Sequence, residues 1–325
     1  MTTKLSEKWP AIERVARAHG ALHVGASSLS DGHAGVFEEW IARGHHAGMR
    51  YLEKNRDARL HPQGRFPWAK SAVVILVPYA SERPVAPEGA LSHHVARYAL
   101  GDDYHEVLQS ILESVEGELP GVRTWRYVDT GPLSDRALAT QAGLGWIGRN
   151  AMLINEEHGS WFFIGTLLTG LENDITAAAV ADRCGSCTRC LDACPTEAIL
   201  PGRTVASELC ISYGTIEHRG ALPEHFTGHL EGNAFGCDIC QEVCPWNQAP
   251  VEPHPAFVPR ARYGATPVTD LLRFEQADFS ALFAKSAVKR AKLEGMKRNV
   301  SALGKREGAS DDARVDAAVE ILPDR

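Results

Sequence analysis

Residues 184–195 are Cys184-Gly-Ser-Cys187-Thr-Arg-Cys190-Leu-Asp-Ala-Cys194-Pro195, and residues 237–245 are Cys237-Asp-Ile-Cys240-Gln-Glu-Val-Cys244-Pro245. These two runs contain seven of the eight cysteines in the chain. Spacers of two or three residues, with a proline after the last cysteine, are typical of bacterial ferredoxins that hold two iron–sulfur clusters. The proline lacks an N–H and ends each ligand loop in a turn. The pattern predicts two 4Fe-4S clusters and a chain that handles electrons.

The cysteines also divide into two complete ligand sets. In two-cluster ferredoxins, the fourth cysteine of a run binds the other cluster. This crossover gives one cluster the first three cysteines of the first run and the last cysteine of the second, Cys184, Cys187, Cys190 and Cys244. The other cluster takes the remaining cysteines of the runs and the one isolated cysteine, Cys194, Cys237, Cys240 and Cys210.

Zinc is the main alternative ligand, because paired C-x-x-C motifs also build closed tetrahedral sites. It explains the tight runs of cysteines less well. A disulfide framework fits less well still, since the chain has 325 residues and begins with no secretory leader. The first ten residues are polar, without a twin-arginine motif or an apolar segment. We therefore expect a protein of the reducing cytoplasm.

Length and composition describe a globular protein. A chain of 325 residues corresponds to about two domains, and an apolar fraction of 44% is ordinary for a protein with a buried core. No apolar stretch approaches the roughly 20 residues that cross a bilayer, so we expect no membrane association. We expect a monomer, because no exposed apolar seam is evident.

The first 175 residues alternate between strand and helix patterns. The continuous apolar run Ala72–Tyr79 predicts a buried central strand. Further strands are predicted at residues 22–26, 124–129 and 161–168, and helices at residues 6–19, 34–48, 104–118 and 135–142. This alternation predicts a layered α/β (α+β) domain over residues 1–175.

Two smaller parts follow this domain. Residues 176–260 form the predicted cluster module, which is loop-rich apart from short helical turns such as residues 191–199, because the clusters replace much of the hydrophobic core. Residues 261–325 are predicted to be helical and to resemble a single helical-repeat unit, with helices at residues 268–283, 287–299 and 312–321.

Charge is unevenly distributed. The formal net charge of −7 argues against general affinity for polyanions. Between Lys285 and Arg306, however, eight Lys and Arg residues are opposed only by Glu294. A basic patch on an otherwise acidic protein indicates local contact with phosphates. A solvated helix face explains the charge alone equally well.

Asp129 is a candidate functional residue in the first domain. It stands at the end of a predicted strand, before a Gly-Pro turn and a predicted helix. A carboxylate at a strand end is well placed for chemistry. A turn-forming aspartate is at least as compatible with this position.

Three glycines in Gly143-Leu-Gly-Trp-Ile-Gly148 permit a tight turn or close approach of the backbone to a flat group. They follow a predicted helix rather than a strand, so the motif does not indicate a dinucleotide site.

Together with both cysteine runs, several segments resemble epoxyqueuosine reductases in the same order. They are Arg97-Tyr-Ala-Leu-Gly-Asp-Asp-Tyr-His105, Asp129-Thr-Gly-Pro132, the three-glycine segment 143–148, Gly159-Ser-Trp-Phe-Phe163, Cys210-Ile-Ser-Tyr213 and residues 236–247. The resemblance extends from about residue 10 to about residue 305.

The resemblance implies a corrinoid-binding catalytic domain that carries cobalamin beside the two 4Fe-4S clusters. It implies reduction of epoxyqueuosine to queuosine in tRNA with GUN anticodons, using electrons from an external low-potential donor. Nothing in composition or spacing indicates cobalamin. In this family the corrinoid has no histidine beneath the cobalt.

The resemblance also assigns roles to residues. Asp129 would be the general acid, and we expect burial beside an apolar corrin face to raise its pKa well above ~3.9. Arg97 would line the corrinoid or substrate pocket with Tyr98, Tyr104 and His105, although each fits a structural role equally well. The remaining expected corrin neighbours are Asn150, Leu153, Ile164, Ser212, Tyr213 and Asp238, of which Leu153 and Ile164 also fit a packing role.

Next to the ligand cysteines, Ser212, Tyr213 and Asp238 would lie between the second cluster and the cobalt. In the basic segment, the residues expected to bind tRNA phosphates are Lys289, Arg290, Lys297 and Arg298.

Two other functions remain possible from the sequence. A corrinoid-dependent reductive dehalogenase has the same cofactors, but such proteins usually carry a twin-arginine leader. A ferredoxin-type electron carrier has no need of about 175 residues of α/β domain.

Overall fold

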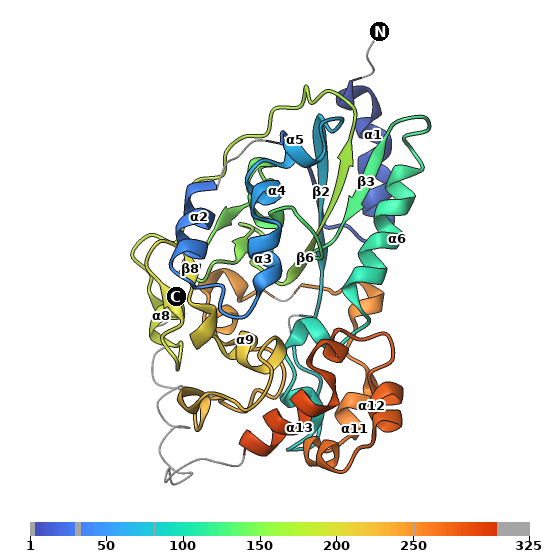
Figure 1. Ribbon diagram of the computed structural model, residues 1–325. Coiled ribbons are helices and arrows are strands. Elements are labelled where there is room, and N and C mark those ends of the chain that lie inside the picture. Colours follow the sequence, from blue (N-terminus) through green and yellow to red (C-terminus); the bar gives the residue numbers. More distant parts are fainter. Residues whose placement is uncertain (1–3, 30–33, 81, 250, 304–325) are drawn as a thin grey trace, which may run out of the picture.

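The computed structural model describes residues 4–29, 34–80, 82–249 and 251–303 (Figure 1). At its centre lies a four-stranded antiparallel sheet in the order β1-β2-β6-β3. Its strands are β1 (His23–Ser27), β2 (Ser71–Pro78), β6 (Phe162–Thr169) and β3 (Thr124–Tyr127). The four predicted strands are therefore confirmed. The domain is a mixed α/β structure whose sheet is antiparallel throughout.

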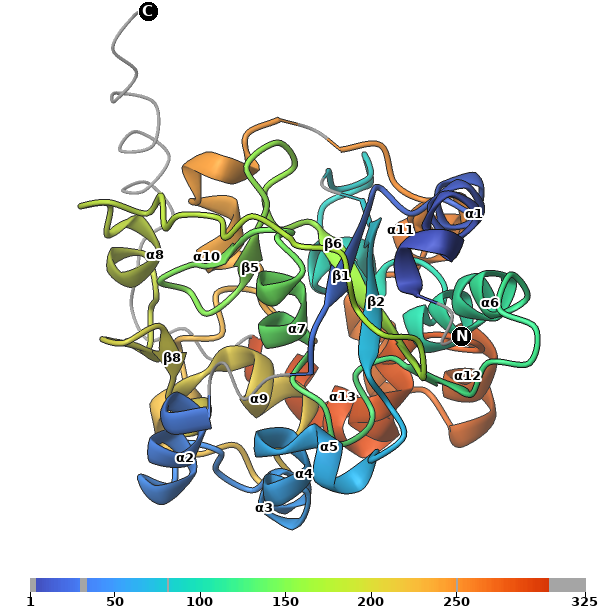
Figure 2. The same cartoon turned by 90° about the horizontal axis from the view of Figure 1, so that it is seen from above.

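Helices cover both faces of the sheet, which explains the continuous apolar run in β2. All eight β2 residues are buried. Val73, Ile75 and Val77 face the hydrophobic cluster formed with α1 (Leu5–Ala18) and α6 (Tyr104–Glu116). The alternate residues of β2 face α7 (Asp135–Gln141) on the other side (Figure 2). Because successive side chains of a strand point to opposite faces, both sets must be apolar.

The helix predicted at residues 34–48 is shorter than expected. It ends as α2 (Ala34–Ala42), and turns follow up to Gly48. Gly44 has a φ of 74°, a left-handed conformation that ends helices. Three short helices complete this side of the molecule, α3 (Arg50–Lys54), α4 (Arg56–Leu60) and α5 (Pro62–Arg65).

The cysteine-rich part contains only short elements. A two-stranded hairpin, β4 (Trp146–Ile147) with β5 (Leu153–Ile154), leads into it. Single-turn helices carry one cysteine from each run, α8 (Arg189–Asp192) and α10 (Ile239–Glu242). The helical turns expected at residues 191–199 end early, because the chain enters the hairpin of β7 (Ile199–Leu200) and β8 (Thr204–Val205). Cys210 precedes α9 (Ile211–Ile216).

Short 3₁₀ helices connect these parts. They are η1 (Leu91–His93), η2 (Arg97–Ala99), η3 (Ser207–Leu209), η4 (Glu224–Phe226), η5 (Pro245–Asn247) and η6 (Pro255–Phe257).

Each of the two C-terminal helices predicted within the described residues is divided. The elements are α11 (Ala261–Ala265), η7 (Val268–Leu272), α12 (Gln276–Leu282), η8 (Ala287–Ala291) and α13 (Lys292–Leu303). A capping box of Glu275 and Asp278 starts α12 anew. Lys292, with a φ of 62°, separates η8 from α13. The helix predicted at residues 312–321 lies outside the described residues.

The C-terminal helices share a hydrophobic core with earlier parts of the chain. Leu91, Leu100 and Phe235 are fully buried in one cluster with Phe283 and Met296. Residues 91–100 thus hold the C-terminal helices beside the central domain. The three-part domain division and the repeat-like arrangement stay predictions. None of the helices in the described parts of the chain is long and apolar enough to cross a bilayer.

Candidate active site and cluster-binding loops

Electrostatic neighbours link cysteines within each of the two sets that the crossover predicts, although the assignment of ligands to clusters stays a prediction. The pKa of the Cys190 thiol is raised by burial first and then by Cys244, Cys184 and Cys187. Burial also raises the pKa of Cys244, with Cys184 and Cys187 as neighbouring charges. The four cysteines of the first predicted ligand set are therefore electrostatic neighbours of one another.

The cysteines of the second predicted ligand set are electrostatic neighbours as well. Burial raises the pKa of Cys237 to about 12, and Cys210 and Cys194 add to the shift. Cys240 has a pKa raised well above its usual value by burial, and its neighbours include Cys237, Cys210 and Cys190. Because Cys190 belongs to the first set, the two sets are adjacent.

The spacing of the sulfur atoms argues against zinc. Among the described residues, which include all eight cysteines, no three cysteine sulfurs lie within 4.8 Å of one another. Four thiolates around one Zn²⁺ at 2.3 Å would be about 3.8 Å apart. The wider spacing fits ligands at the corners of a larger cluster.

Asp129 stands in a strongly constrained loop between β3 and α7. Its φ of 52° places the backbone in the left-handed region, which non-glycine residues rarely adopt. The Tyr127 hydroxyl donates to the carbonyl oxygens of Asp129 at 2.9 Å and Leu133 at 3.0 Å. The Arg59 guanidinium donates to the carbonyls of Leu133 at 2.5 Å and Gly131 at 2.6 Å. Side chains from two other segments thus hold the loop.

The Asp129 carboxylate meets two side chains from the start of α6. The Tyr104 hydroxyl donates to its Oδ2 at 2.6 Å, and His105 Nε2 lies 3.7 Å from the same oxygen. On its other side, His105 Nδ1 lies 2.8 Å from the Asp103 carboxylate, which also caps α6 by accepting from the His105 N–H. Tyr104 stacks between His105 and Phe163, with ring centroids 4.1 and 4.5 Å away. The result is a row of alternating acidic and proton-carrying groups.

The expected increase in the pKa of Asp129 is wrong for this structure. Desolvation acts to raise the pKa, but the hydrogen-bonding groups of His105 and Tyr104 and the positive charges of His105 and Arg59 outweigh it and lower it. The side chain is also 61% exposed. Although desolvation acts to lower the pKa of His105, Asp103 and Asp129 raise it to about 9. At neutral pH the proton therefore resides on His105.

Asp135, the first residue of α7, is a carboxyl group that the sequence analysis missed. Burial, and then the charge of Asp129, raise its pKa well above the usual value. Its Oδ1 is buried, with no hydrogen-bond partner among the described residues. Only the shared segment Asp129-Thr-Gly-Pro-Leu-Ser-Asp135 could have indicated it.

Arg97 and Asp238 join the central domain to the second cysteine run. Asp238 is 3% exposed, and its Oδ2 accepts from the Arg97 N–H at 2.8 Å and from Arg83 Nη2 at 3.3 Å. Arg97 Nη1 donates to Glu242 at 2.7 Å. The Arg97 guanidinium lies 4.8 Å from the centre of the Trp161 ring. This network places the loop of Cys237 and Cys240 against residues 83–97.

Asn150 is buried, and its Nδ2 donates to the Cys240 carbonyl at 3.2 Å. Leu153 is buried in the hydrophobic cluster on the α7 face, and the partly buried Ile164 packs against the same cluster. Ser212 and Tyr213 come two and three residues after Cys210, whose thiol accepts from the N–H groups of both.

Two tyrosines lie within electrostatic range of Asp129. Burial raises the pKa of Tyr98, and the charges of Asp129, Asp238 and Glu217 raise it further. Burial and the charges of Glu217 and Asp129 raise the pKa of Tyr51 to about 12. The predicted residues Asp129, Asp238 and Arg97 are thus brought to one region, to which Glu217 and Tyr51 also belong.

The four predicted tRNA-binding residues differ in their surroundings. Lys289 is exposed. Arg290 donates from Nε and Nη2 to Glu217 at 2.8 and 2.9 Å, and Asp129 is among the charges that act on it. Lys297 is partly exposed. The side chains of Lys289 and Lys297 thus reach the surface, whereas Arg290 is already paired with Glu217.

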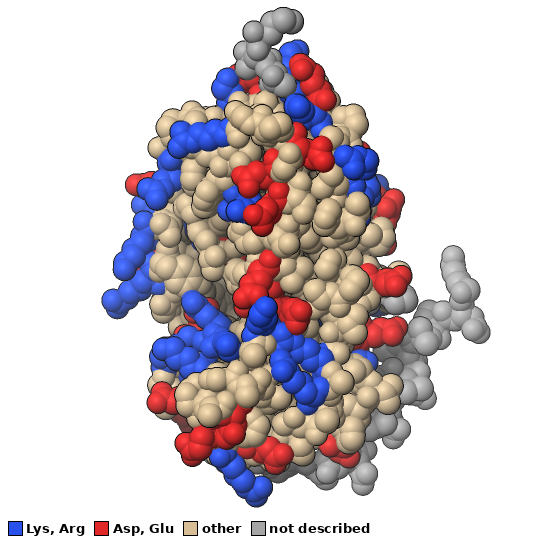
Figure 3. Space-filling view, turned by 90° about the vertical axis from the view of Figure 1, so that its right-hand side faces the viewer, with Lys and Arg blue, Asp and Glu red and all other residues tan. Residues whose placement is uncertain are grey.

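The Arg298 side chain hydrogen-bonds to other parts of the protein. Its guanidinium donates to the carbonyls of His218, Gly220 and Gly214 and to the Asn299 side chain. These contacts occupy the donors of all three guanidinium nitrogens, which explains this basic residue without any nucleic acid. On the face drawn in Figure 3, basic and acidic side chains are interspersed over the lower half of the molecule.

The glycines of the 143–148 segment are required by the fold itself. A Cβ at Gly145 would lie 2.1 Å from the Ile154 carbonyl oxygen, and one at Gly143 would lie 2.9 Å from the Ala178 carbonyl oxygen. A Cβ at Gly148 would lie 2.4 Å from the Ile154 side chain. The segment is a tightly packed hairpin.

Two family models match the chain. Residues 183–247 match the 4Fe-4S double cluster binding domain, which confirms the prediction of two clusters. Residues 59–130 match "Epoxyqueuosine reductase QueG, DUF1730".

Curated and solved proteins agree with these matches. The chain is 40% identical to the epoxyqueuosine reductase of Leadbetterella byssophila over 284 residues, which cover 86% of this chain and 91% of the relative. A crystal structure of an epoxyqueuosine reductase with an epoxyqueuosine-modified tRNA-Tyr stem loop has a TM-score of 0.85 and 30% identity, covering 91% of this chain and 80% of that one.

A Bacillus subtilis epoxyqueuosine reductase, whose aspartate-bearing catalytic loop is swung out of the active site, has a TM-score of 0.82 and 29% identity, with the same coverage. Sequence identity over nearly the full length and the shared fold lead to one conclusion: the chain belongs to the epoxyqueuosine reductase family.

Proposed function

We propose that this chain reduces epoxyqueuosine to queuosine in the anticodon loop of tRNA. The observation that carries the proposal is the Asp129 carboxylate, held by Tyr104 and facing the cationic His105, in the region that Asp238 and Arg97 join to the cluster loops. Both C–O bonds of the epoxide break, a C=C bond forms, and the oxygen leaves as water. The reaction consumes two electrons and two protons.

Electrons would enter through the two clusters. In our assignment, Cys184, Cys187, Cys190 and Cys244 hold one cluster, and Cys194, Cys210, Cys237 and Cys240 hold the other. The adjacency of Cys190 and Cys240 supports transfer between them. Clusters of this type pass single electrons at low potential, so an external low-potential donor is required.

The region between Asp129 and the second ligand set fits a corrinoid. The partly buried Ile164 offers apolar surface with Leu153 packed in the cluster behind it, while Asn150 and Asp238 adjoin the loop of Cys240. Arg97 Nε is buried without a hydrogen-bond partner among the described residues, as expected beside a bound polar group. Bound cobalamin would supply electrons to a ring carbon of the epoxide. We include Ser212 and Tyr213 among its neighbours, because both adjoin Cys210.

The protons would come from the row of groups at the start of α6. Asp129 is ionised at neutral pH, whereas His105 is protonated, since its pKa is about 9. Asp103 would stabilise the His105 cation, and Asp129 would relay the His105 proton to the epoxide oxygen as a C–O bond breaks. Solvent would then reprotonate His105, which supplies the second proton of the departing water by the same route. Tyr104 holds the carboxylate in place. General-acid catalysis by such a group contributes about 10²–10⁴-fold to a rate.

The tRNA phosphates would bind to Lys289, Arg290 and Lys297. The charge of Asp129 acts on Arg290, so a phosphate bound at Arg290 would lie near the catalytic carboxylate. Phosphate contacts position an RNA, and the modified base in the pocket would provide selectivity. We further propose GUN anticodons as the substrate class, a monomeric enzyme and a cytoplasmic location, where the eight thiols stay reduced.

The experiment combines a deletion strain with purified protein. Nucleosides from the tRNA of the deletion strain should contain epoxyqueuosine in place of queuosine, and the wild-type gene should reverse this change. Anaerobically purified protein, supplied with a low-potential reductant and that tRNA, should form queuosine. Unchanged queuosine content in the deletion strain, in an organism with no second copy, would contradict the proposal.

A further inference from the structure

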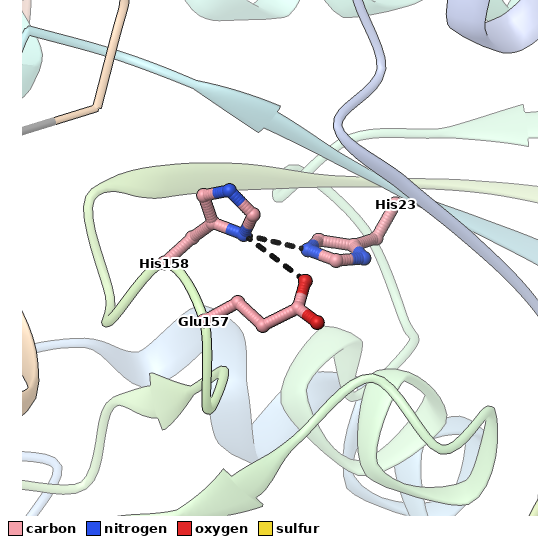
Figure 4. Close-up of side chains that lie close together, drawn as sticks. All are labelled: His23, Glu157 and His158. Carbon is pink, nitrogen blue, oxygen red and sulfur yellow. Dashed lines mark hydrogen bonds and ion pairs between the residues drawn. The ribbon is translucent and has the colours of Figure 1, made fainter.

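A second cluster of potential ligands lies outside the catalytic region. It consists of His23 at the start of β1 and of Glu157 and His158 in the turn before β6 (Figure 4). His23 Nε2 and His158 Nδ1 are 2.9 Å apart, and a Glu157 oxygen lies 3.8 Å from the same His158 nitrogen. One ligand atom from each side chain lies within 4.8 Å of the other two.

We propose that these three side chains bind a divalent transition-metal ion, with Zn²⁺ as the best fit. Tetrahedral Zn²⁺ takes nitrogen and oxygen ligands at about 2.0–2.2 Å, so its ligand atoms lie about 3.4 Å apart. The separations of 2.9 and 3.8 Å lie on either side of that value. The third separation is within 4.8 Å, so the three ligand atoms lie close to the spacing that a tetrahedral ion requires.

The chemistry of the three groups suits zinc. A hydrogen-bonded pair of histidines needs no carboxylate, yet Glu157 directs its oxygen to the shared nitrogen (Figure 4). Two histidines, one carboxylate and an open position form a known type of zinc site.

The backbone holds the ligands in place. His23 pairs with Leu76 in the central sheet. The Asn155 side chain accepts from the N–H groups of Glu157 at 3.0 Å and His158 at 3.1 Å, which fixes the turn. Because both segments are rigid, the ligand atoms stay close together without a metal.

The ion would fasten the sheet to the cluster module. The Ser160 N–H donates to the Asn247 side chain at 2.6 Å, and Asn247 follows Cys244 by three residues. A Cβ at Gly159 would lie 2.0 Å from Asn247 Oδ1, so the two segments pack closely. Zn²⁺ between His23 and His158 would therefore couple β1 to the segment that follows a predicted cluster ligand.

The test is calorimetric titration of the cluster-loaded protein with Zn²⁺ under anaerobic conditions, with visible absorbance to verify that the clusters persist. Wild-type protein should bind one equivalent in the micromolar range, and Zn²⁺ should slow amide exchange in residues 23–25 and 155–160. His23→Gln and His158→Gln should each weaken binding at least tenfold, and Glu157→Gln should weaken it less. His229→Gln, which removes an exposed histidine elsewhere, is the matched control.

Three results would overturn the proposal: no saturable binding by the wild type, equal affinity in His158→Gln, or slowed exchange elsewhere than in these two segments. Each is independent of the reductase assignment, because none of the measurements requires turnover.

Discussion

The Tyr104 hydroxyl donates a 2.6 Å hydrogen bond to the Asp129 carboxylate, across 25 residues of sequence. This contact joins the start of α6 to the loop after β3 and places His105 beside the same oxygen. The hydrogen-bonding groups of His105 and then Tyr104 stabilise the ionised carboxylate, which is why the pKa of Asp129 is lowered although desolvation acts to raise it.

Replacing Asp129 with Asn should remove most of the activity. The amide keeps the size of the carboxyl group but cannot relay a proton, so we expect turnover to fall by about 10²–10⁴-fold. Iron and acid-labile sulfide should stay at wild-type levels. Queuosine formation in single-turnover assays is the measurement, and Asp174→Asn, an aspartate that pairs with Ser6, is the control. Near wild-type turnover from pH 6 to 8 would contradict the role of Asp129.

The dependence of turnover on pH should reflect the titration of His105. Its pKa is raised from 6.5 to about 9, so turnover should decline as the pH rises through about 9. His105→Gln should be slower and should lack this decline. The raised pKa also means that the charged form stabilises the fold below pH 6.5, and that this stabilisation is lost as the pH approaches and passes 9. Chemical denaturation of both proteins between pH 6 and 10 measures this. An identical high-pH decline in His105→Gln would assign it to another group.

Paired cysteine substitutions should test the crossed ligand sets. The double variant Cys190→Ser/Cys244→Ser removes two ligands from one proposed cluster and should retain about four iron atoms of the other. Cys240→Ser/Cys244→Ser removes one ligand from each cluster and should impair both. Iron and sulfide analysis, with electron paramagnetic resonance of the reduced proteins, distinguishes the two patterns. The reverse result would indicate uncrossed sets.

Substitutions at Lys289 and Arg298, two basic residues close together in sequence, should have different effects. Lys289→Glu should weaken tRNA binding and reduce the slope of log affinity against log salt by about 1, with an unchanged melting temperature. Arg298→Ala should destabilise the fold by roughly 2–3 kcal/mol, since it leaves partly buried carbonyls without a charged donor. Lys8→Glu on α1 is the surface control. Filter binding at several salt concentrations and thermal unfolding measure the two effects.

If Lys289→Glu binds tRNA as wild type does at every salt concentration, the basic segment is a solvated surface. If Arg298→Ala retains the wild-type melting temperature, the hydrogen bonds of its guanidinium contribute little to stability.

The cluster module and the central strand were predictable because their signals are local. Ligand spacing in the two cysteine runs is a property of short loops, and an iron–sulfur cluster tolerates few other arrangements. Likewise, β2 is buried on both faces, so its whole sequence is apolar. The breaks at Glu275 and Lys292 were missed, because apolar spacing continues across both.

The protonation of the candidate site was decided by tertiary structure alone. Asp129 by itself resembles any turn aspartate, and its pKa depends on Tyr104 and His105, which reach it only when α6 packs against the sheet. Similarly, Arg298 and Lys289 carry the same charge in the sequence. They differ because backbone carbonyls of residues 214–220 surround one and solvent surrounds the other.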